Sequence, residues 1–316
     1  MLHFHENIDR AVTIEMRPRG VPRGVNLQAY HYVRATGPPL SHQIAHALLA
    51  QPGSHIGFLT GMVFPPHLPH GEIDGPIGSA VLGHSLSQLG HPVSILVEEP
   101  VLPVMEALVQ VLGADRLRLI NASAVDDGDW DAVADDLGVV IAIEKLGVNR
   151  KGQRHLITGT PFDPGYPYAD HVVNRLNDQR KLTIGFGDGG NEVGFGAIFD
   201  FARAIVPHGR ECGCPCEDGT ITSTATRYLF PAASSNLGAY GVAAALALQT
   251  GRFELLPDPE NEMPLLEAAL EAGAIDGGTG RRIAAEDGIP GETAVGVLRV
   301  LNTIVRMGHQ DFERAF

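Results

Sequence analysis

A glycine-rich segment, residues 185–196, carries the side chains of this chain that are best suited to chemistry. Six of its twelve residues are glycines, and Asp188, Asn191 and Glu192 stand among them. Glycines let a backbone turn sharply and come close to a ligand. A loop that only had to turn would not need two carboxylates and a carboxamide so close together. The segment therefore predicts a loop that holds a cation or acts on a polar substrate, with Asp188, Asn191 and Glu192 as candidate catalytic residues.

The flanking sequence places this loop between a strand and a helix. An apolar run typical of a strand, residues 181–184, precedes it, and a helical run, residues 197–205, follows it. Ligands of open parallel sheets bind at such junctions, outside the carboxyl ends of the strands. Gly189 and Gly190 leave the backbone open to a ligand and are candidate substrate contacts.

Two plainer interpretations of the loop stay open. Glycine-rich loops between a strand and a helix often bind nucleotide phosphates, and Gly185, Gly187 and Gly190 match the GxGxxG spacing. Asp188 and Glu192 would repel a pyrophosphate unless a metal ion lay between them. The other alternative is a purely structural turn.

Acidic residues also follow three further predicted strands. They are Asp74 in a glycine- and proline-rich loop after residues 55–60, Glu98 and Glu99 after residues 92–97, and Glu144, next to Lys145, after residues 139–143. Because the carboxyl ends of parallel strands meet at one edge of a sheet, these acids should converge with Asp188 and Glu192. Converging carboxylates need a positive partner, and a hard divalent cation takes oxygen ligands.

The sequence therefore predicts a Mg²⁺ or Mn²⁺ site. Its candidate ligands are Asp74, Glu144, Asp188 and Glu192, and Glu144 is also a candidate catalytic residue. Any single acid could instead cap a helix or lie in a solvated loop, which is the favoured interpretation for Glu98 and Glu99. Two histidines that precede the Asp74 loop, His67 and His70, are weaker candidate ligands.

Three more polar side chains are candidate substrate contacts. Ser235 and Asn236 follow the predicted strand 227–232, at its carboxyl end, although either could simply cap the helix that follows. Lys145 could hold a substrate carboxylate or pair with a nearby acid.

All three cysteines lie in the stretch Cys212-Gly213-Cys214-Pro215-Cys216. Thiols spaced in this way could bind zinc or undergo redox chemistry, but a zinc site would need a fourth, distant ligand, and the spacing differs from a redox CxxC motif. A loop with reduced thiols is the simplest interpretation. So few, tightly clustered cysteines favour a reducing, cytoplasmic location over a disulfide framework.

The pattern of apolar runs predicts alternating strands and helices. Strands are expected at 55–60, 92–97, 116–120, 139–143, 182–186 and 227–232, and helices at 41–50, 78–89, 101–112, 130–137, 169–178, 197–205, 237–249, 265–272 and 293–306. This alternation is typical of βαβ units. It predicts an α/β protein, a three-layer α/β/α sandwich with a mostly parallel, Rossmann-like doubly wound sheet. Residues 1–38 are expected to form an arm or covering segment, and residues 39–316 a single domain.

The composition limits the classes of molecule that this protein is expected to bind. The formal net charge is −14, and hydrophobic residues make up 44% of the chain. Because no cluster of basic residues offsets this charge, nucleic acids and anionic membranes are disfavoured. No apolar run is long enough for a transmembrane helix, and the first residues carry no secretory signal. A small-molecule amino acid substrate fits, and assembly into a homo-oligomer is compatible with the sequence.

Several segments, in order along the chain, resemble the D-glutamate cyclase family, whose cyclase domain also forms the C-terminal part of longer eukaryotic proteins. They are Gly71–Gly78, Ala142–Lys145 with Gly152, Gly187–Gly194, Cys212–Cys216, Ser235–Tyr240 and Glu286–Pro290. The string Gly-Asp-Gly-Gly-Asn-Glu at 187–192 is the most specific of these. The chain departs from the family at Ile73, Ile77 and Leu237, and it has Arg227 near a position where the family often has an acid beside the site.

The resemblance implies a hydro-lyase that converts D-glutamate to 5-oxo-D-proline with loss of water. A metal ion held by Asp188, Glu192 and either Asp74 or Glu144 would polarise the γ-carboxylate, and a carboxylate free of metal would act as the base. A metal-dependent hydrolase or phosphatase, and a nucleotide-binding module without catalysis, are the alternatives.

Overall fold

The computed structural model describes residues 1–19, 25–162, 165 and 167–315, and its centre is a six-stranded sheet. The strands are β1 (Ile56–Leu59), β2 (Val93–Val97), β3 (Leu117–Asn121), β4 (Val139–Ile143), β7 (Leu182–Gly187) and β8 (Tyr228–Pro231). Every neighbouring pair is parallel, in the order β3-β2-β1-β4-β7-β8. The chain thus starts in the middle of the sheet, builds one half outward, returns beside β1 and builds the other half, as doubly wound folds do.

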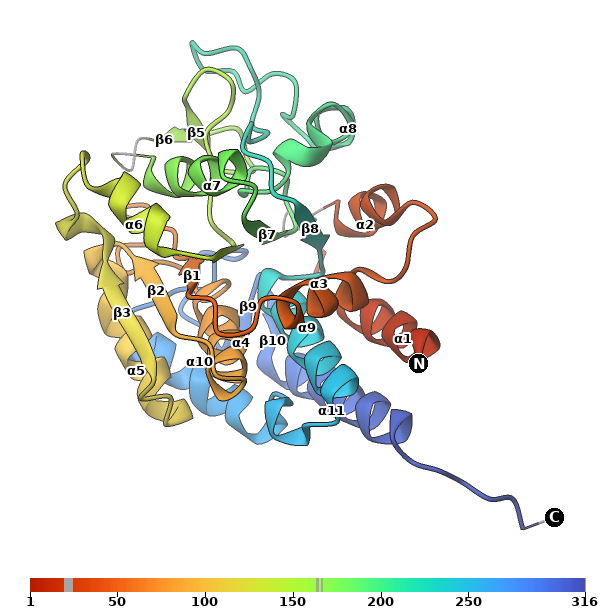
Figure 1. Ribbon diagram of the computed structural model, residues 1–316. Helices are drawn as coiled ribbons and strands as arrows, with labels where there is room; N and C mark the ends of the chain where they lie inside the picture. Colours follow the sequence, from red (N-terminus) through yellow and green to blue (C-terminus); the bar gives the residue numbers. More distant parts are fainter. Residues whose placement is uncertain (20–24, 163–164, 166, 316) are drawn as a thin grey trace.

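Helices cover both faces of this sheet (Figure 1). The larger layer contains α1 (Leu2–Val12), α3 (Leu40–Leu49), α4 (Pro76–Gln88), α5 (Leu102–Leu112), α9 (Ser235–Thr250), α10 (Glu262–Glu271) and α11 (Gly291–Gly308). The opposite face is covered by α6 (Trp130–Asp136) and α7 (Tyr168–Asp178), where the rings of Trp130 and Tyr168 stack with centroids 4.6 Å apart. The predicted three-layer sandwich with a mostly parallel sheet is confirmed.

Most of the predicted elements form within a few residues of their expected ends. Two helices differ at their starts. The helix predicted at 197–205 begins as a 3-10 turn, Gly196–Ile198, which is followed by α8 (Phe199–Ile205). The helix expected at 237–249 already begins at Ser235. Ser234, with extended backbone, accepts a hydrogen bond from the Leu237 N–H at 3.2 Å and so caps α9. The prediction that Ser235 or Asn236 could be the cap is wrong by one or two residues, because both already lie in the first turn.

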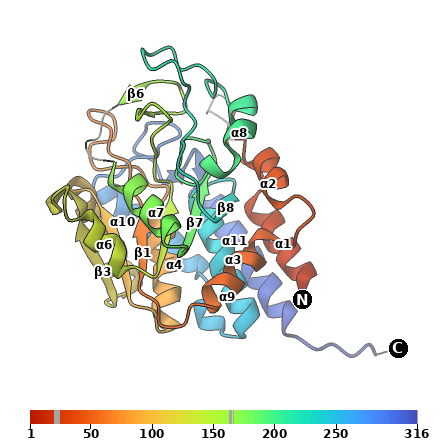
Figure 2. The ribbon, with the colours of Figure 1, turned by 45° about the horizontal axis from the view of Figure 1, so that its top comes forward.

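Short elements surround the carboxyl edge of the sheet. The two-stranded pairs β5 (Arg154–His155) with β6 (Pro161–Phe162) and β9 (Ala285–Glu286) with β10 (Ile289–Pro290) are both antiparallel. Figures 1 and 2 show β5, β6 and the long loop between α8 and β8 gathered at one end of the molecule. Hydrogen bonds join the loop before β8 to the segment between β4 and β5, such as the one from Ser223 N–H to the Val148 carbonyl at 2.8 Å.

The first 38 residues contain α1 and α2 (Asn26–Arg34). Ile8 and Val12 of α1 are fully buried in the same core as α9 and α11. The Val25 N–H donates to the Asp188 carbonyl at 3.0 Å, so this segment also contacts the glycine-rich loop. No helix among the described residues is long and apolar enough to span a membrane.

The α4 and α9 helices approach each other closely, and this contact fixes the loops at their amino ends. At Gly78 in α4, a Cβ atom would lie 2.9 Å from the Asn236 Cα and 3.1 Å from the Ala239 Cβ of α9. At Gly83, five residues further along the same helix, the nearest atoms would lie at 3.4 Å, which is ordinary contact.

Gly78→Ala should therefore destabilise the fold by about 1–3 kcal/mol, because the added methyl group forces the two helices apart. Gly83→Ala is the matched control and should be neutral or stabilising by up to about 1 kcal/mol, since alanine favours a helix. Urea unfolding of both variants checks this. Equal destabilisation of the two would contradict the close contact.

Candidate functional site

A cavity of about 460 Å³ opens at the carboxyl edge of the sheet, where the strand order reverses between β1 and β4. Among the described residues that line it, five are acidic and one is an arginine; they are Glu72, Glu144, Asp188, Glu192, Asp287 and Arg17. The lining therefore carries an excess of potential negative charge in a partly enclosed space. Such an excess is maintained only if some carboxyl groups hold protons or a cation compensates them.

The carboxylates form two overlapping groups. Oxygen atoms of Asp74, Asp188 and Asp287 all lie within 4.8 Å of one another, and the same holds for Glu144, Asp188 and Glu192. Asp188 belongs to both groups. The structure thus brings the four predicted metal ligands together at one edge of the sheet, while their roles stay predictions.

Asp188 follows β7 and is held by a cation from the amino-terminal segment. Its Oδ2 accepts a hydrogen bond from Arg17 Nη1 at 2.9 Å, and the same nitrogen lies 3.5 Å from Asp287 Oδ2. Burial raises the pKa of Asp188 to about 7, although the charge of Arg17 opposes the shift. The nearby Glu192 and Asp74 carboxylates add to it. Asp188 is therefore a carboxyl group that changes its protonation near neutral pH.

The side chain of Glu192 accepts hydrogen bonds from the backbone of its own glycine-rich loop and so holds the loop closed. Its Oε1 accepts hydrogen bonds from the N–H groups of Asp188 (3.1 Å) and Gly189 (2.7 Å), and its Oε2 accepts one from Gly190 N–H (2.6 Å). These backbone donors are the ones that a bound phosphate would need. Because a carboxylate of the protein already occupies them, the geometry argues against the dinucleotide interpretation of the loop.

Glu144 stands at the end of β4 in an uncommon backbone conformation. Its φ is +47°, a left-handed value that costs free energy for a residue with a side chain and often marks a functional position. Its Oε2 accepts a hydrogen bond from Ser235 Oγ at 2.6 Å. Burial raises the pKa of Glu144 well above its usual range, and the charges of Glu192 and Asp188 add to this.

Asp74 does not line the cavity and lies at the amino terminus of α9. Its two oxygens accept hydrogen bonds from the N–H groups of Ser235 (2.9 Å) and Asn236 (2.8 Å), and Oδ1 also accepts from Gly75 N–H at 3.1 Å. Burial raises the pKa of Asp74 to about 7, Asp287 adds to the shift, and the three N–H groups oppose it.

Ser235 and Asn236 are fully buried and join the acidic loops to one another. Asn236 Oδ1 accepts from the N–H groups of Gly75 (2.9 Å) and Gly78 (2.7 Å), and its Nδ2 donates to Glu286 Oε2 at 2.7 Å. The two side chains thus position Glu144 and the Asp74 loop in this structure. Their role as substrate contacts stays a prediction.

Asn191 links the glycine-rich loop to β5. Its Nδ2 donates to the His155 carbonyl at 2.9 Å. Gly189 and Asn191 both line the cavity. A Cβ atom at Gly189 would lie 3.0 Å from Glu192 Oε1, and Gly190 has a φ of +107°, so both glycines are needed for the loop to close around the glutamate.

Lys145 pairs with a nearby acid, which is one of the two expectations for it. Its Nζ contacts Glu98 Oε1 at 2.5 Å and the Gly61 carbonyl at 2.8 Å, and the side chain is buried. Lys145 and Glu98 both border a smaller pocket that does not contain Asp188. Glu98 is therefore a partly buried partner of Lys145 rather than a solvated loop residue, whereas Glu99 is exposed.

The two histidines and Arg227 lie outside the acidic groups. His67 borders the cavity but is exposed and packs on the ring of Phe64, and His70 Nδ1 contacts the Pro100 carbonyl at 3.1 Å. Arg227 is exposed and precedes β8, at the edge of the sheet opposite the cavity. The expectation that Arg227 stands beside the site is wrong, because it lies at the start of a parallel strand and the cavity lies at the ends.

Sequence reasoning missed three residues that the structure places at the cavity. Arg17 comes from the segment interpreted as an arm, and Asp287 comes from the turn between β9 and β10. Glu72 is 4% exposed, and its Oε1 has no hydrogen-bond partner among the described residues. Burial raises its pKa well above the usual range. Glu72 and Asp287 lie in the motifs Gly71–Gly78 and Glu286–Pro290. Neither acid directly follows a strand of the central sheet, so the rule for strand ends did not identify them.

Comparison with known proteins identifies the family of this chain. The family model described as "D-glutamate cyclase-like, C-terminal" matches residues 20–302. The chain belongs to this family. The human protein named "D-glutamate cyclase, mitochondrial" is 25% identical over 207 residues, which cover 58% of the chain and 31% of that relative. The chain therefore matches about a third of the length of this curated relative.

The raised pKa values lead to a prediction about stability. The pKa of Asp188 rises from 3.8 to about 7 on folding, so between these pH values the unfolded chain loses a proton that the folded protein keeps. Its contribution to stability is present at low pH and is lost as the pH rises through this window. The melting temperature of wild-type protein in EDTA should thus fall more steeply from pH 5 to pH 8 than that of Asp188→Asn, by several degrees.

Comparison with the Asp188→Asn variant separates the pH dependence that Asp188 causes from the pH dependence that His5 causes. Burial lowers the pKa of His5 from 6.5 to about 4, which acts in the opposite direction in both proteins. Parallel melting curves for wild type and Asp188→Asn would show that Asp188 is already ionised at pH 5.

Proposed function

We propose that this protein is a metal-dependent hydro-lyase that cyclises D-glutamate, or a related amino dicarboxylic acid, to 5-oxo-D-proline with loss of water. The observation that carries the proposal is the convergence of Glu144, Asp188 and Glu192 on one cavity in a chain of the D-glutamate cyclase-like family. The name of the human relative supports the choice of substrate.

The donor set suits a hard divalent cation. Asp74, Glu144, Asp188 and Glu192 offer carboxylate oxygens, which Mn²⁺ and Mg²⁺ prefer, and the unpartnered Oε1 of Glu72 is one more buried oxygen nearby. When bound, such an ion would polarise the γ-carboxyl group of the substrate. The raised pKa values of Asp188 and Glu144 show how strongly these acids disfavour negative charge without a compensating cation.

The chain's own carboxyl groups suit the proton transfers of the reaction. The substrate nitrogen must lose two protons in all, one before it bonds to the γ-carbon and one after, and the γ-carboxylate oxygen that departs must gain both to leave as water. A carboxyl group whose pKa lies above its usual range can exchange protons at neutral pH. With the ion held by Asp74, Asp188 and Glu192, the carboxyl group of Glu144 stays free of metal. Glu144, oriented by the Ser235 hydroxyl, is our candidate for this role.

Arg17 and the glycine-rich loop supply the means to orient the substrate. The Arg17 guanidinium borders the cavity and can pair with a substrate carboxylate. Gly189 lets the loop backbone approach the ligand closely. Holding the amine against the γ-carboxyl group in a small cavity would supply much of the rate enhancement.

Glu144→Gln should lower kcat for D-glutamate by about a hundredfold or more, because an amide cannot exchange the proton. The assay follows loss of primary amine and formation of 5-oxoproline in the presence of Mn²⁺. Glu99→Gln is the matched control: Glu99 also follows a strand but is exposed, and this variant should keep wild-type activity. If metal-loaded wild type forms no product from either D- or L-amino acids, the proposed function is wrong.

Asp188 belongs to both carboxylate groups, so Asp188→Ala should abolish tight Mn²⁺ binding. Elemental analysis after dialysis against Mn²⁺ and gel filtration checks this. If the variant binds as much manganese as the wild type, the ion does not bind at Asp188. The cytoplasmic location, the homo-oligomer and the absence of nucleic-acid and membrane partners remain predictions.

A further inference from the structure

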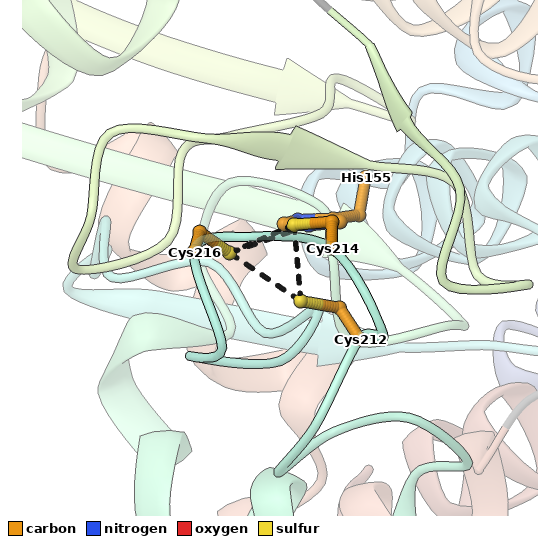
Figure 3. A group of neighbouring side chains, drawn as sticks. All are labelled: His155, Cys212, Cys214 and Cys216. Atoms are coloured by element: carbon orange, nitrogen blue, oxygen red, sulfur yellow. Dashed lines mark hydrogen bonds between the residues drawn. The ribbon is translucent and has the colours of Figure 1, made fainter.

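The three cysteines converge with a histidine from a distant segment (Figure 3). Cys212 Sγ lies 3.3 Å from both Cys214 Sγ and Cys216 Sγ, and the latter two lie 3.2 Å apart. His155 Nε2, from β5, lies 3.3 Å from Cys214 Sγ and 3.7 Å from Cys216 Sγ. His155 thus lies where the fourth, distant ligand that the cysteine stretch requires would stand.

The ligand atoms of these four residues all lie within 4.8 Å of one another, close enough to surround one ion. A disulfide would need sulfurs about 2.05 Å apart, and all three cysteines are free. In a tetrahedral zinc site with Zn–S bonds of about 2.3 Å, neighbouring sulfurs lie about 3.8 Å apart. The cluster needs to expand by only about half an ångström to reach this spacing. An iron–sulfur cluster is larger than a single ion and would need its ligands further apart.

The local backbone explains how residues so close in sequence can converge. Gly213 has a φ of +72°, which lets the chain turn between Cys212 and Cys214. Asn149 Nδ2 contacts Cys216 Sγ at 3.4 Å and donates to the Gly219 carbonyl at 2.9 Å. Such N–H contacts to sulfur are typical of the groups that surround a metal–thiolate site.

Burial shields three of the four residues of this cluster from solvent, and Cys216 is partly buried. His155 is fully buried, and Cys212 and Cys214 are 7% and 9% exposed. A loop that only contained reduced thiols would not need a buried imidazole nitrogen next to its sulfur atoms, so this arrangement favours a metal site.

We propose that Cys212, Cys214, Cys216 and His155 bind one structural zinc ion. Three thiolates and one imidazole complete a tetrahedron, so the site is closed and leaves no position for a substrate. Its soft ligands select zinc, whereas the carboxylates of the cavity select a harder ion. The two sites are chemically independent, and the zinc site does not depend on the proposed reaction.

The ion would fix one wall of the cavity. It joins the long loop before β8 to β5, and the His155 carbonyl accepts the hydrogen bond from Asn191 in the glycine-rich loop. The residues directly after His155, namely Leu156, Ile157 and Thr158, line the cavity. Loss of the ion should therefore loosen this wall as well as the cysteine loop.

Elemental analysis of the full chain, purified with Zn²⁺ and dialysed, should find about one zinc per chain. The cluster contains every cysteine of the sequence, so titration with an organomercurial should release the zinc as three thiols react. Cys214→Ser should lose the zinc. Asp188→Ala is the matched control and should retain it while losing manganese, which separates failure of this proposal from failure of the proposed function.

Cobalt keeps the proposal testable if the variant does not fold. Wild-type protein exchanged into Co²⁺ should show the visible d–d bands of tetrahedral cobalt and a thiolate charge-transfer band. Protein that contains no stoichiometric zinc and remains colourless with Co²⁺ would overturn the proposal. So would zinc that persists after all three thiols have reacted, or iron or copper in its place.

Discussion

The site depends on the burial of several carboxyl groups beside one another at the carboxyl edge of a parallel sheet. Asp74, Glu144 and Asp188 come from loops far apart in sequence, yet each pKa is raised by burial and by neighbouring acids. Once these acids are ionised, the fold gains no stability from this arrangement, because buried like charges repel each other. It is maintained by the packing of the surrounding layers, and it creates a strong preference for protons or cations in the cavity.

Backbone N–H groups and amides hold these acids in place. Glu192 binds three N–H groups of its own loop, and Asn236 joins the Asp74 loop to the amino terminus of α9. The close contact of α9 with Gly78 of α4 sets the distance between these two segments. The site is therefore built on rigid helix starts and strand ends, which suits a reaction that must fold a flexible substrate so that its two ends meet.

The sheet and part of the site could be predicted from the sequence. Short apolar runs such as 139–143 predicted buried parallel strands, and the general rule for their carboxyl ends then brought Glu144 and Asp188 together. Arg17 and Asp287 could not be found in this way, because tertiary packing alone brings an amino-terminal segment and a short hairpin over the cavity. The same reason hid His155, which lies 57 positions before Cys212 along the chain. Arg227 shows the converse error, since nearness in sequence to a motif does not decide at which end of a strand a residue lies.

The central claim is that the acidic strand ends bind a cation at which a small amino acid is held. The most direct measurement is anomalous diffraction at the manganese edge from crystals grown with Mn²⁺ and 5-oxo-D-proline. The account predicts a manganese peak bonded to the Asp188 carboxylate, with the ligand in the cavity beside Glu144. A saturated crystal with no peak within bonding distance of Asp188, and with Arg17 as its sole cationic partner, would contradict it.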